Sequence, residues 1–326
     1  MRAVVITKHG APEVLSVIDI DKPQPSANEI LVKVRATSLN RADLMQRMGF
    51  YPDPFPGKQE IPGLEFAGTV DLCGSAAKVW KPGDQVMGIV SGGGYAEYLV
   101  VHENQVMRVP SKVGLDDAGA IPEVFITAWD ALVCQGNLQS GGWALVHAGA
   151  SGVGTAAIQI CKAIGANVAV TCSSGKRDAC LALGADIAVD YRTEDFVEVC
   201  NKVTNSHGVN VVLDVIGGEY LNRNVATLAL KGTIVQVGLM GGASTPFNIS
   251  ALMPKRARLI GTVLRPRPLE EKIAVTQRFI SEMLPMFETG KLRSVIDSRY
   301  KLENISVAHS YMETNASTGK IIIDVC

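Results

Sequence analysis

The sequence lacks long hydrophobic runs and any excess of basic residues. No apolar stretch reaches the roughly 18 residues that a membrane helix requires. Lys8 and His9 interrupt the apolar N-terminus before a signal-peptide core can form. Lys and Arg together number 31 against 32 for Asp and Glu, whereas proteins that grip a phosphate backbone usually carry a basic excess. We therefore expect neither a membrane nor nucleic acid as the main partner.

Closely spaced cysteines are also missing. The seven cysteines are scattered along the chain, and no two of them form a C-x-x-C pair. This pattern predicts neither a disulfide framework nor a thiolate zinc knot. We expect a soluble protein of the reducing cytoplasm, with most cysteines acting as small buried side chains that have no redox role.

The length of 326 residues predicts about two domains, and a hydrophobic content of 47% is enough for a substantial core. The sequence is β-rich up to about residue 120. Alternating apolar and polar residues predict short strands at 30–36, 68–70, 84–89 and 96–101. Prolines, among them Pro52, Pro54 and Pro56, mark turns. This spacing favours a small barrel or folded sheet.

Beyond about residue 119, short apolar runs alternate with helical segments. Buried strands are predicted at 143–147, 167–171, 187–190, 209–214, 233–237 and 259–263. Helices are predicted at 155–164, 177–183, 194–203, 220–228 and near 250–253. The alternation predicts an α/β domain with a doubly wound parallel sheet. A longer helix at 269–288 follows, and strands near Tyr300 and at 321–325 are expected to rejoin the first domain.

A glycine-rich turn joins the first of these strands to its helix. The loop has the order G-x-x-G-x-G and is formed by Gly149, Ser151, Gly152, Val153 and Gly154. Such a turn lets the backbone approach a pyrophosphate, and the following helix presents free N–H groups to it. With a strand before it and a helix after it, the loop predicts a Rossmann-type dinucleotide site.

The end of the second strand indicates which dinucleotide. NAD sites usually place an Asp or Glu there for the ribose 2′-hydroxyl, but no carboxylate lies between residues 171 and 177. Ser173, Ser174 and Lys176 instead offer hydroxyl and cationic donors for a 2′-phosphate, and Tyr191 is placed to cover the adenine or donate to that phosphate. An ordinary solvated helix start is the alternative for Lys176. The prediction is NADPH.

Zinc ligands of the kind that a metal-dependent dehydrogenase needs are not apparent. The first domain offers Cys73, His9 and His102, and their spacing is not that of converging ligands. The sequence therefore predicts hydride transfer without a metal.

The chain resembles the zinc-free quinone oxidoreductases of the medium-chain dehydrogenase/reductase superfamily, and within them the p53-inducible quinone oxidoreductase branch. The resemblance spans essentially the whole chain and rests on residues 39–47, 62–65, 92–94, 120–123, 147–159, 238–242 and 319–321. It implies a GroES-like β-barrel catalytic domain formed by residues 1–120 and 266–326, beside an NADP(H)-binding Rossmann domain at 121–265. It also implies a homodimer.

The resemblance also implies roles for individual residues. Asn40 and Tyr51 match family residues that line the quinone pocket, and zinc-containing relatives carry metal-binding residue types near Asn40 and residues 63–65. Residues expected near the nicotinamide or its ribose are Thr127, Leu239, Met240, Val263, Leu264 and Arg265, with Lys320 near the cofactor.

Hydride transfer from NADPH to a small-molecule quinone demands little from side chains beyond orientation and a neutral donor to the quinone oxygen. Asn40 and Tyr51 are the predicted donors, against the alternatives of a turn-capping Asn and a loop aromatic. Two other functions stay open at this point. One is NADPH-dependent reduction of activated alkenes such as enones, and the other is a non-catalytic, NADPH-binding structural role.

Overall fold

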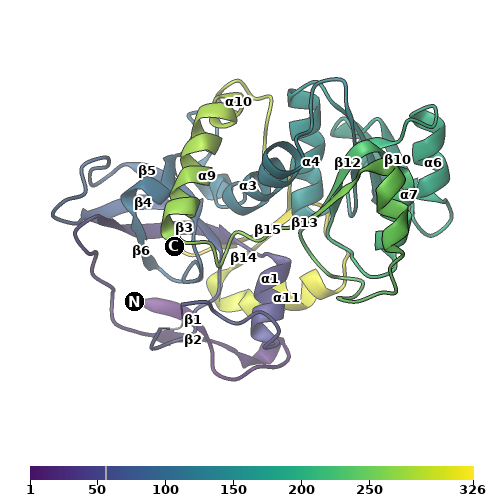
Figure 1. The fold of residues 1–326 in the computed structure, drawn as a ribbon. Coiled ribbons are helices and arrows are strands. Elements are labelled where there is room, and N and C mark those ends of the chain that lie inside the picture. The colour runs from purple at the N-terminus through teal and green to yellow at the C-terminus, as the bar shows by residue number, and fades with distance from the viewer. Residues whose placement is uncertain (56) are drawn as a thin grey trace. The chain divides into compact units, whose positions relative to one another are not determined.

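The computed structural model describes residues 1–55 and 57–326, so the turn predicted at Pro56 lies outside the described residues. The chain divides into two compact units, Met1–Ile126 with Leu264–Cys326 (unit 1) and Thr127–Val263 (unit 2). The first division falls within helix α3 (Pro122–Trp129). Each unit contains its own main sheet (Figure 1).

Unit 2 contains the predicted parallel sheet. Its strands lie in the order β10-β9-β8-β11-β12-β13, and every neighbouring pair is parallel. The bounds are β8 (Trp143–Val146), β9 (Asn167–Cys172), β10 (Ile187–Asp190), β11 (Val209–Asp214), β12 (Leu228–Gln236) and β13 (Arg258–Gly261). The strand order reverses between β8 and β11, which is the place where open α/β sheets bind ligands.

Helices connect these strands near the predicted positions. They are α4 (Gly152–Ala163), α5 (Arg177–Ala182), α6 (Phe196–Val203), α7 (Tyr220–Thr227) and α8 (Leu252–Lys255), with a π-helical turn at Asp130–Gln135. Strand β12 begins five residues earlier than the predicted strand at 233–237. Its first part is irregular, because Lys231 adopts a left-handed φ of 64° and the register with β11 shifts.

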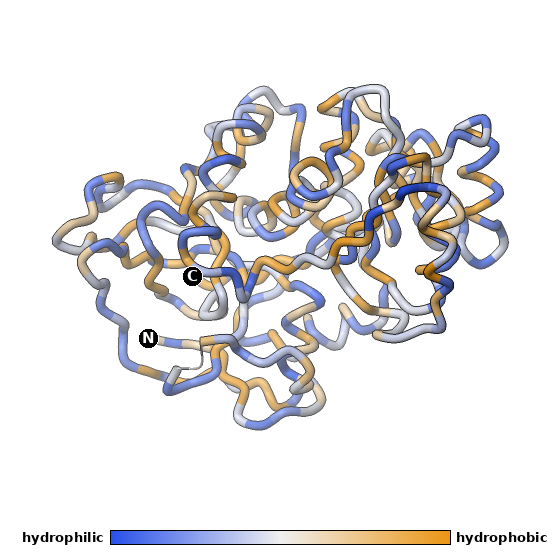
Figure 2. Tube along the Cα trace, viewed as in Figure 1, coloured by the Kyte–Doolittle hydropathy of each residue, from blue (hydrophilic) through white to orange (hydrophobic). Residues whose placement is uncertain are grey.

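Unit 1 contains a seven-stranded, mainly antiparallel sheet and a separate hairpin of β1 and β2. The bounds are β1 (Arg2–Ile6), β2 (Leu15–Asp19), β3 (Glu29–Ser38), β4 (Glu65–Cys73), β5 (Gln85–Ile89), β6 (Tyr98–His102), β7 (Val106–Arg108), β14 (Ile296–Lys301) and β15 (Lys320–Asp324). As predicted, the C-terminal strands rejoin this domain, since β15 pairs with β3. The three isoleucines of β15 are fully buried. In Figure 2, hydrophobic (orange) segments alternate with hydrophilic (blue) ones along the trace.

The helices of unit 1 are α1 (Arg41–Arg47), α2 (Leu115–Ala118), α9 (Leu269–Glu282), α10 (Leu284–Glu288) and α11 (Ile305–Glu313). The single helix predicted at 269–288 is wrong, because α9 ends before Met283 and α10 begins after it. Pro285 has no N–H for the helical hydrogen bond, and its ring clashes with the preceding turn. No helix within residues 1–55 and 57–326 is long and apolar enough to cross a membrane.

Candidate active site

The polar centre of unit 1 is an ion pair between two buried side chains. Glu65 is the first residue of β4 and Lys320 the first of β15, and their side chains are 0% and 3% exposed. Strand β3 pairs with β4 along one edge and with β15 along the other, which brings these strand ends together. The Lys320 Nζ lies 2.9 Å from Glu65 Oε1.

All three ammonium hydrogens of Lys320 have acceptors. Besides Glu65, Nζ donates to the Leu39 carbonyl at 2.7 Å and to Asn40 Oδ1 at 2.6 Å. A buried ion pair costs desolvation unless such bonds complete it. Because an ammonium has only three donors, Lys320 in this arrangement orients Asn40 and Glu65 and has no donor left for a cofactor.

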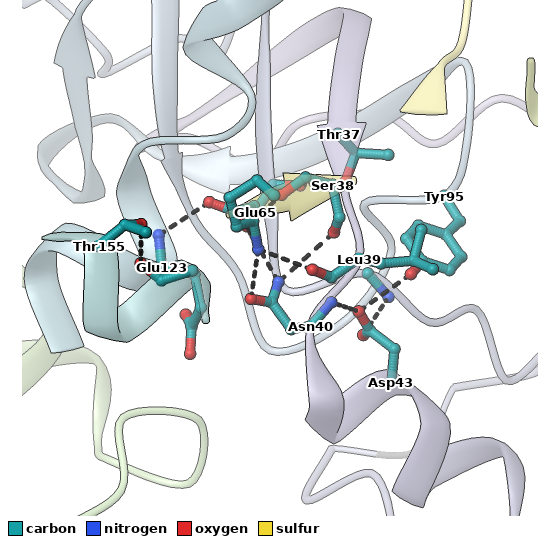
Figure 3. A network of polar contacts seen from close by, with 12 residues as sticks. Thr37, Ser38, Leu39, Asn40, Asp43, Glu65, Tyr95, Glu123 and Thr155 are labelled. Carbon is teal, nitrogen blue, oxygen red and sulfur yellow. Dashed lines mark hydrogen bonds and ion pairs between the residues drawn. The ribbon is translucent and has the colours of Figure 1, made fainter. Parts of the chain in front are cut away.

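Glu65 is equally well bonded. Its carboxylate accepts from the Ser38 hydroxyl at 2.5 Å, from Asn40 Nδ2 at 3.0 Å and from the Glu123 backbone N–H at 2.9 Å. The last bond places the carboxylate at the N-terminus of α3, where the helix dipole favours a negative charge. Figure 3 shows these groups converging on Glu65. These hydrogen bonds fix the Glu65 carboxylate and, with it, the amide of the candidate donor Asn40.

Asn40 stands at the N-terminus of α1. Its backbone N–H donates to the Asp43 carboxylate at 2.7 Å, and the Asp43 N–H donates back to its carbonyl at 2.9 Å. The two amide hydrogens point at Glu65 and, at a long 3.4 Å, at the Ser38 carbonyl. A bond of 3.4 Å is weak. Only that hydrogen could turn to a substrate oxygen without breaking a good bond.

Asp43 ties this centre to the neighbouring loops. Its carboxylate also accepts from the Tyr95 hydroxyl at 2.9 Å and from the Gly63 N–H at 3.2 Å. Burial raises the pKa of Asp43 to about 6, although these donors oppose the shift. Gly63 has a φ of +98°, and an added Cβ there would lie 2.6 Å from the Tyr95 ring. Only glycine fits this contact.

Tyr51 lies on the loop after α1, and Arg265 holds that loop. The buried Arg265 guanidinium donates to the carbonyls of Tyr51 at 3.1 Å and Ser91 at 2.6 Å and to Gln46 Oε1 at 3.0 Å, and it stacks 5.0 Å from the Tyr51 ring centre. Burial raises the pKa of Tyr51 to about 12, so the phenol stays neutral. Its hydroxyl makes no hydrogen bond with the part of the chain that the structure describes.

A small cavity lies beside these residues. It is too narrow to hold a water molecule and is lined by Ile89, Val90, Glu123, Leu264, Arg265 and Lys272. Lys272 donates to the Ser91 hydroxyl at 2.5 Å and stands 5.1 Å from the centre of the Phe55 ring. Burial raises the pKa of Glu123 to about 8, and the Glu65 carboxylate adds to the shift.

In unit 2, the glycine loop is shaped by steric demands within the protein. A Cβ on Gly149 would lie 2.5 Å from Val170 on β9, and one on Gly154 would lie 2.3 Å from the Ala148 carbonyl. Ser151 caps α4 by accepting from the Gly154 N–H at 3.0 Å. The preceding helical N–H groups, of Gly152 and Val153, are those that an α-helix leaves without an internal partner.

A buried histidine precedes this loop in the sequence. His147, at the end of β8, contacts the Thr171 hydroxyl at 3.0 Å and Asn224 Oδ1 at 2.7 Å, and Asn224 in turn donates to Asp214 at 2.9 Å. Because Asn224 presents its oxygen, we assign the proton of His147 to Nε2. Burial lowers the pKa of His147, which keeps it neutral.

Beyond β9 the chain forms a short turn at Ser174–Lys176 and enters α5. The side chains of Ser173 and Lys176 are half-buried and Ser174 is exposed. Arg177 is bound to Glu194 at 2.9 Å. Tyr191 is 44% exposed, and the Arg192 guanidinium lies 5.7 Å from its ring centre.

The other predicted residues fall in both units. Thr127 and Val263 are in unit 2, Leu264 and Arg265 are in unit 1, and Leu239 and Met240 follow β12 with about half of their surface exposed. The Met240 N–H donates to the Val215 carbonyl at 3.1 Å, which fixes the backbone of that loop.

Comparison with known proteins identifies the family. Residues 26–111 match the alcohol dehydrogenase GroES-like domain, and residues 152–281 match the family described as zinc-binding dehydrogenase. The quinone oxidoreductase of Homo sapiens is 30% identical over 327 residues, covering 99% of this chain and 97% of that protein. The chain belongs to the quinone oxidoreductases of the medium-chain dehydrogenase/reductase superfamily.

Solved structures share the fold over essentially the whole chain. Escherichia coli quinone oxidoreductase complexed with NADPH is 27% identical, with a TM-score of 0.90 and complete coverage of both chains. The enoyl reductase CurK is 26% identical, with a TM-score of 0.87 and coverage of 99% of this chain and 98% of that one. The fold class predicted from the sequence, a GroES-like domain with a Rossmann sheet, is confirmed.

The residues of unit 2 fit a dinucleotide. Gly149 and Gly154 allow the tight turn, while the first N–H groups of α4 and the hydroxyls beyond β9 are donors suited to phosphates. The carboxylate that usually marks a 2′-hydroxyl site is missing between residues 171 and 177.

The described residues of this quinone oxidoreductase do not fit a metal. Residues 1–55 and 57–326 contain no group of three or more His, Cys, Asp and Glu that could hold one. At the polar centre the Lys320 ammonium stands between Asn40 and Glu65 and would repel a divalent cation. His102 accepts from the Asn104 N–H, and the Cys73 thiol donates to the Trp80 carbonyl.

Sequence reasoning missed several residues of this site. Glu65 and Glu123 belong to segments that carry the family resemblance, but the sequence by itself indicates no role for them, for Asp43 and Lys272, or for the His147 network. A charged residue at the start of a strand that continues with apolar residues is a signal that could have found the buried pair, as in Lys320 before three isoleucines and Glu65 before Phe66 and Ala67.

Proposed function

We propose that the protein is an NADPH-dependent quinone reductase that transfers hydride without a metal. Unit 1 takes the catalytic role and unit 2 the cofactor role. The observation that carries the proposal is the neutral, uncommitted phenol of Tyr51, on a loop that Arg265 holds beside the Asn40–Glu65–Lys320 centre. The similarity to quinone oxidoreductases over the full chain supports it.

The cofactor would be held by the glycine loop and by the turn beyond β9. The N–H groups of Gly152 and Val153 would bind the pyrophosphate, and Ser173, Ser174 and Lys176 would bind a 2′-phosphate. Tyr191 is exposed and able to stack on an adenine. Thr127, Leu239, Met240, Val263 and Leu264 are proposed contacts of the nicotinamide end.

Bound NADPH supplies the hydride. The chain's own task is to hold the quinone for transfer and to stabilise the charge that develops on its oxygen. The Tyr51 hydroxyl is the proposed donor to that oxygen, and one amide hydrogen of Asn40 is the second. Lys320 and Arg265 are positioning residues, because Lys320 orients the Asn40 amide and Arg265 holds the Tyr51 backbone.

Reduction of activated alkenes is the second candidate function. The observation that favours it is the similarity to the enoyl reductase CurK over essentially the whole chain. The same Tyr51 hydroxyl could protonate the α-carbon of an enone or enoyl thioester.

The test is the rate of reduced-nicotinamide oxidation with NADPH and with NADH, each offered an ortho-quinone and an enone. Turnover with NADPH and the quinone alone supports the proposal. A preference for the enone supports alkene reduction instead. NADPH binding without turnover of either acceptor supports a structural role.

Lys176→Ala tests the 2′-phosphate assignment. Loss of one charge-assisted hydrogen bond of about 1.5 kcal/mol should weaken NADPH binding about tenfold. NADH binding should not change, because NADH has no 2′-phosphate. Lys202→Ala, an exposed lysine on α6, is the matched control and should leave both affinities unchanged.

We also propose a homodimer in the cytoplasm. Strand β13 is an edge of the parallel sheet, and Leu259 on it is 44% exposed, so a second copy could extend the sheet there. The scattered spacing of the seven cysteines, with no C-x-x-C pair, supports a reducing compartment. Leu259→Glu should convert the dimer to a monomer in light-scattering measurements, and a wild-type monomer would contradict the proposal.

A further inference from the structure

The Glu123 carboxyl has no hydrogen-bond partner among residues 1–55 and 57–326, whereas its backbone N–H is bound by Glu65. Figure 3 shows the carboxyl pointing away from the Glu65 side chain. It is half-buried and lines the small cavity together with Arg265 and Lys272. An unpaired carboxyl in such a place is costly as an anion, which favours its protonated form.

Glu123 and Tyr51 share a neighbour and act on each other. Arg265 lines the cavity beside Glu123 and also stacks on the Tyr51 ring. The Glu123 charge is one of the causes that raise the pKa of Tyr51. The phenol and the carboxyl make no hydrogen bond within residues 1–55 and 57–326, and they stand close enough to interact beside one arginine.

We propose that Glu123 is the proton source of the reaction and delivers its proton through the Tyr51 hydroxyl. The inference rests on the proposed quinone reductase function. Hydride addition gives the quinone one hydrogen and one electron pair, which leaves a hydroquinone monoanion. The Tyr51 O–H bond breaks as its proton moves to the anion oxygen. The Glu123 O–H bond breaks as its proton restores the phenol through one bridging water, because no direct hydrogen bond joins the two side chains.

The Glu123 carboxylate then takes a proton from water. One quinone, one NADPH and one proton are thus converted to one hydroquinone and one NADP⁺. A second acid is needed because a phenol with a pKa of about 12 is a weak proton donor, unless a stronger acid reprotonates it at once.

The other carboxyls near this point have partners, among them Asp53, which lies 3.8 Å from the Arg265 guanidinium and accepts from the Phe55 N–H at 2.9 Å. The charged and titratable groups that act on Glu123 or line its cavity are Glu65 on β4, Asp43 on α1, Lys320 on β15, Lys272 on α9, and Arg265 and Tyr51 on loops. Glu65 is occupied by the Lys320 pair and three neutral donors, and Asp43 by three donors. With a pKa of about 8, Glu123 carries its proton at neutral pH.

Glu123→Gln tests the relay, because it keeps the shape and removes the acid. In the wild type, kcat for quinone reduction should be level at neutral pH and fall above about pH 8 as Glu123 ionises. In E123Q, kcat at pH 7 should fall about 100-fold and the break near pH 8 should disappear. Glu270→Gln, an exposed glutamate in the first turn of α9, is the control and should keep the wild-type rate and profile.

Infrared difference spectroscopy adds a measurement that does not depend on activity. The wild type minus E123Q should show a carboxylic-acid band at pH 7 that disappears above about pH 8. A missing band, or an E123Q enzyme with the wild-type rate and pH profile, overturns the relay alone. A wild-type protein that binds NADPH but reduces no quinone overturns the proposed function, and the relay with it.

Discussion

Lys320→Met is the sharpest test of how the polar centre of unit 1 is held together. The substitution keeps the length and apolar stem of the side chain but removes the ammonium. Glu65 would remain as a carboxylate with no exposed surface and no cation beside it. The Leu39 carbonyl and Asn40 Oδ1 would also lose their donor.

The expected cost follows from the burial. Removing one partner of a buried ion pair typically costs about 3–5 kcal/mol. The Ser38 hydroxyl, the Asn40 amide and the Glu123 N–H still bind Glu65 in the variant, which places the cost near the lower end, at about 3 kcal/mol. For a unit of this size, that corresponds to a melting temperature lowered by about 6–12 °C.

The assay is thermal unfolding followed by circular dichroism at pH 7. Lys22→Met is the matched control, because Lys22 and Asp71 form an ion pair of 2.7 Å in the same unit with both side chains about one-third exposed. It should leave the melting temperature unchanged. The double variant Glu65→Gln with Lys320→Met should recover most of the loss, since no buried charge remains. If Lys320→Met is as mild as Lys22→Met, the reasoning about the buried pair is refuted.

Three further outcomes are expected. Gly154→Ala should abolish NADPH binding in a fluorescence titration, because the new Cβ would lie 2.3 Å from the Ala148 carbonyl; normal affinity would contradict the packing argument. Arg265→Met should lower kcat for the quinone at least tenfold while NADPH affinity stays unchanged, since it frees the Tyr51 loop; equal losses in both would indicate a direct cofactor role. Burial lowers the pKa of His309 to about 3, so its contribution to stability is complete above about pH 6.5 and declines as the pH falls toward 3. Between pH 6.5 and 5 the wild type should therefore lose about 1.6 kcal/mol more stability in urea unfolding than His309→Gln, and parallel slopes would show that His309 is not the cause.

The sequence alone determined the features that depend on local order. The alternation of apolar strands with helices predicted the parallel sheet of unit 2. The glycine loop between β8 and α4 could also be predicted, because the tight turn and the close backbone approach that require glycine each involve only a few consecutive residues. Strand periodicity also predicted most of β3 and β5. The error at Met283 is of the same local kind, since Pro285 marked the break.

Only the tertiary structure decided which side chains meet. Lys320 and Asn40 are 280 residues apart in the sequence and meet because β15 pairs with the end of β3, two residues before Asn40. The same fold engages all three donors of Lys320 and leaves the Glu123 carboxyl without a hydrogen-bond partner in the described part of the chain. Burial then set the protonation of Asp43, Tyr51 and Glu123. Residue type can be read along a chain, but desolvation and hydrogen bonding depend on neighbours that only the fold brings together.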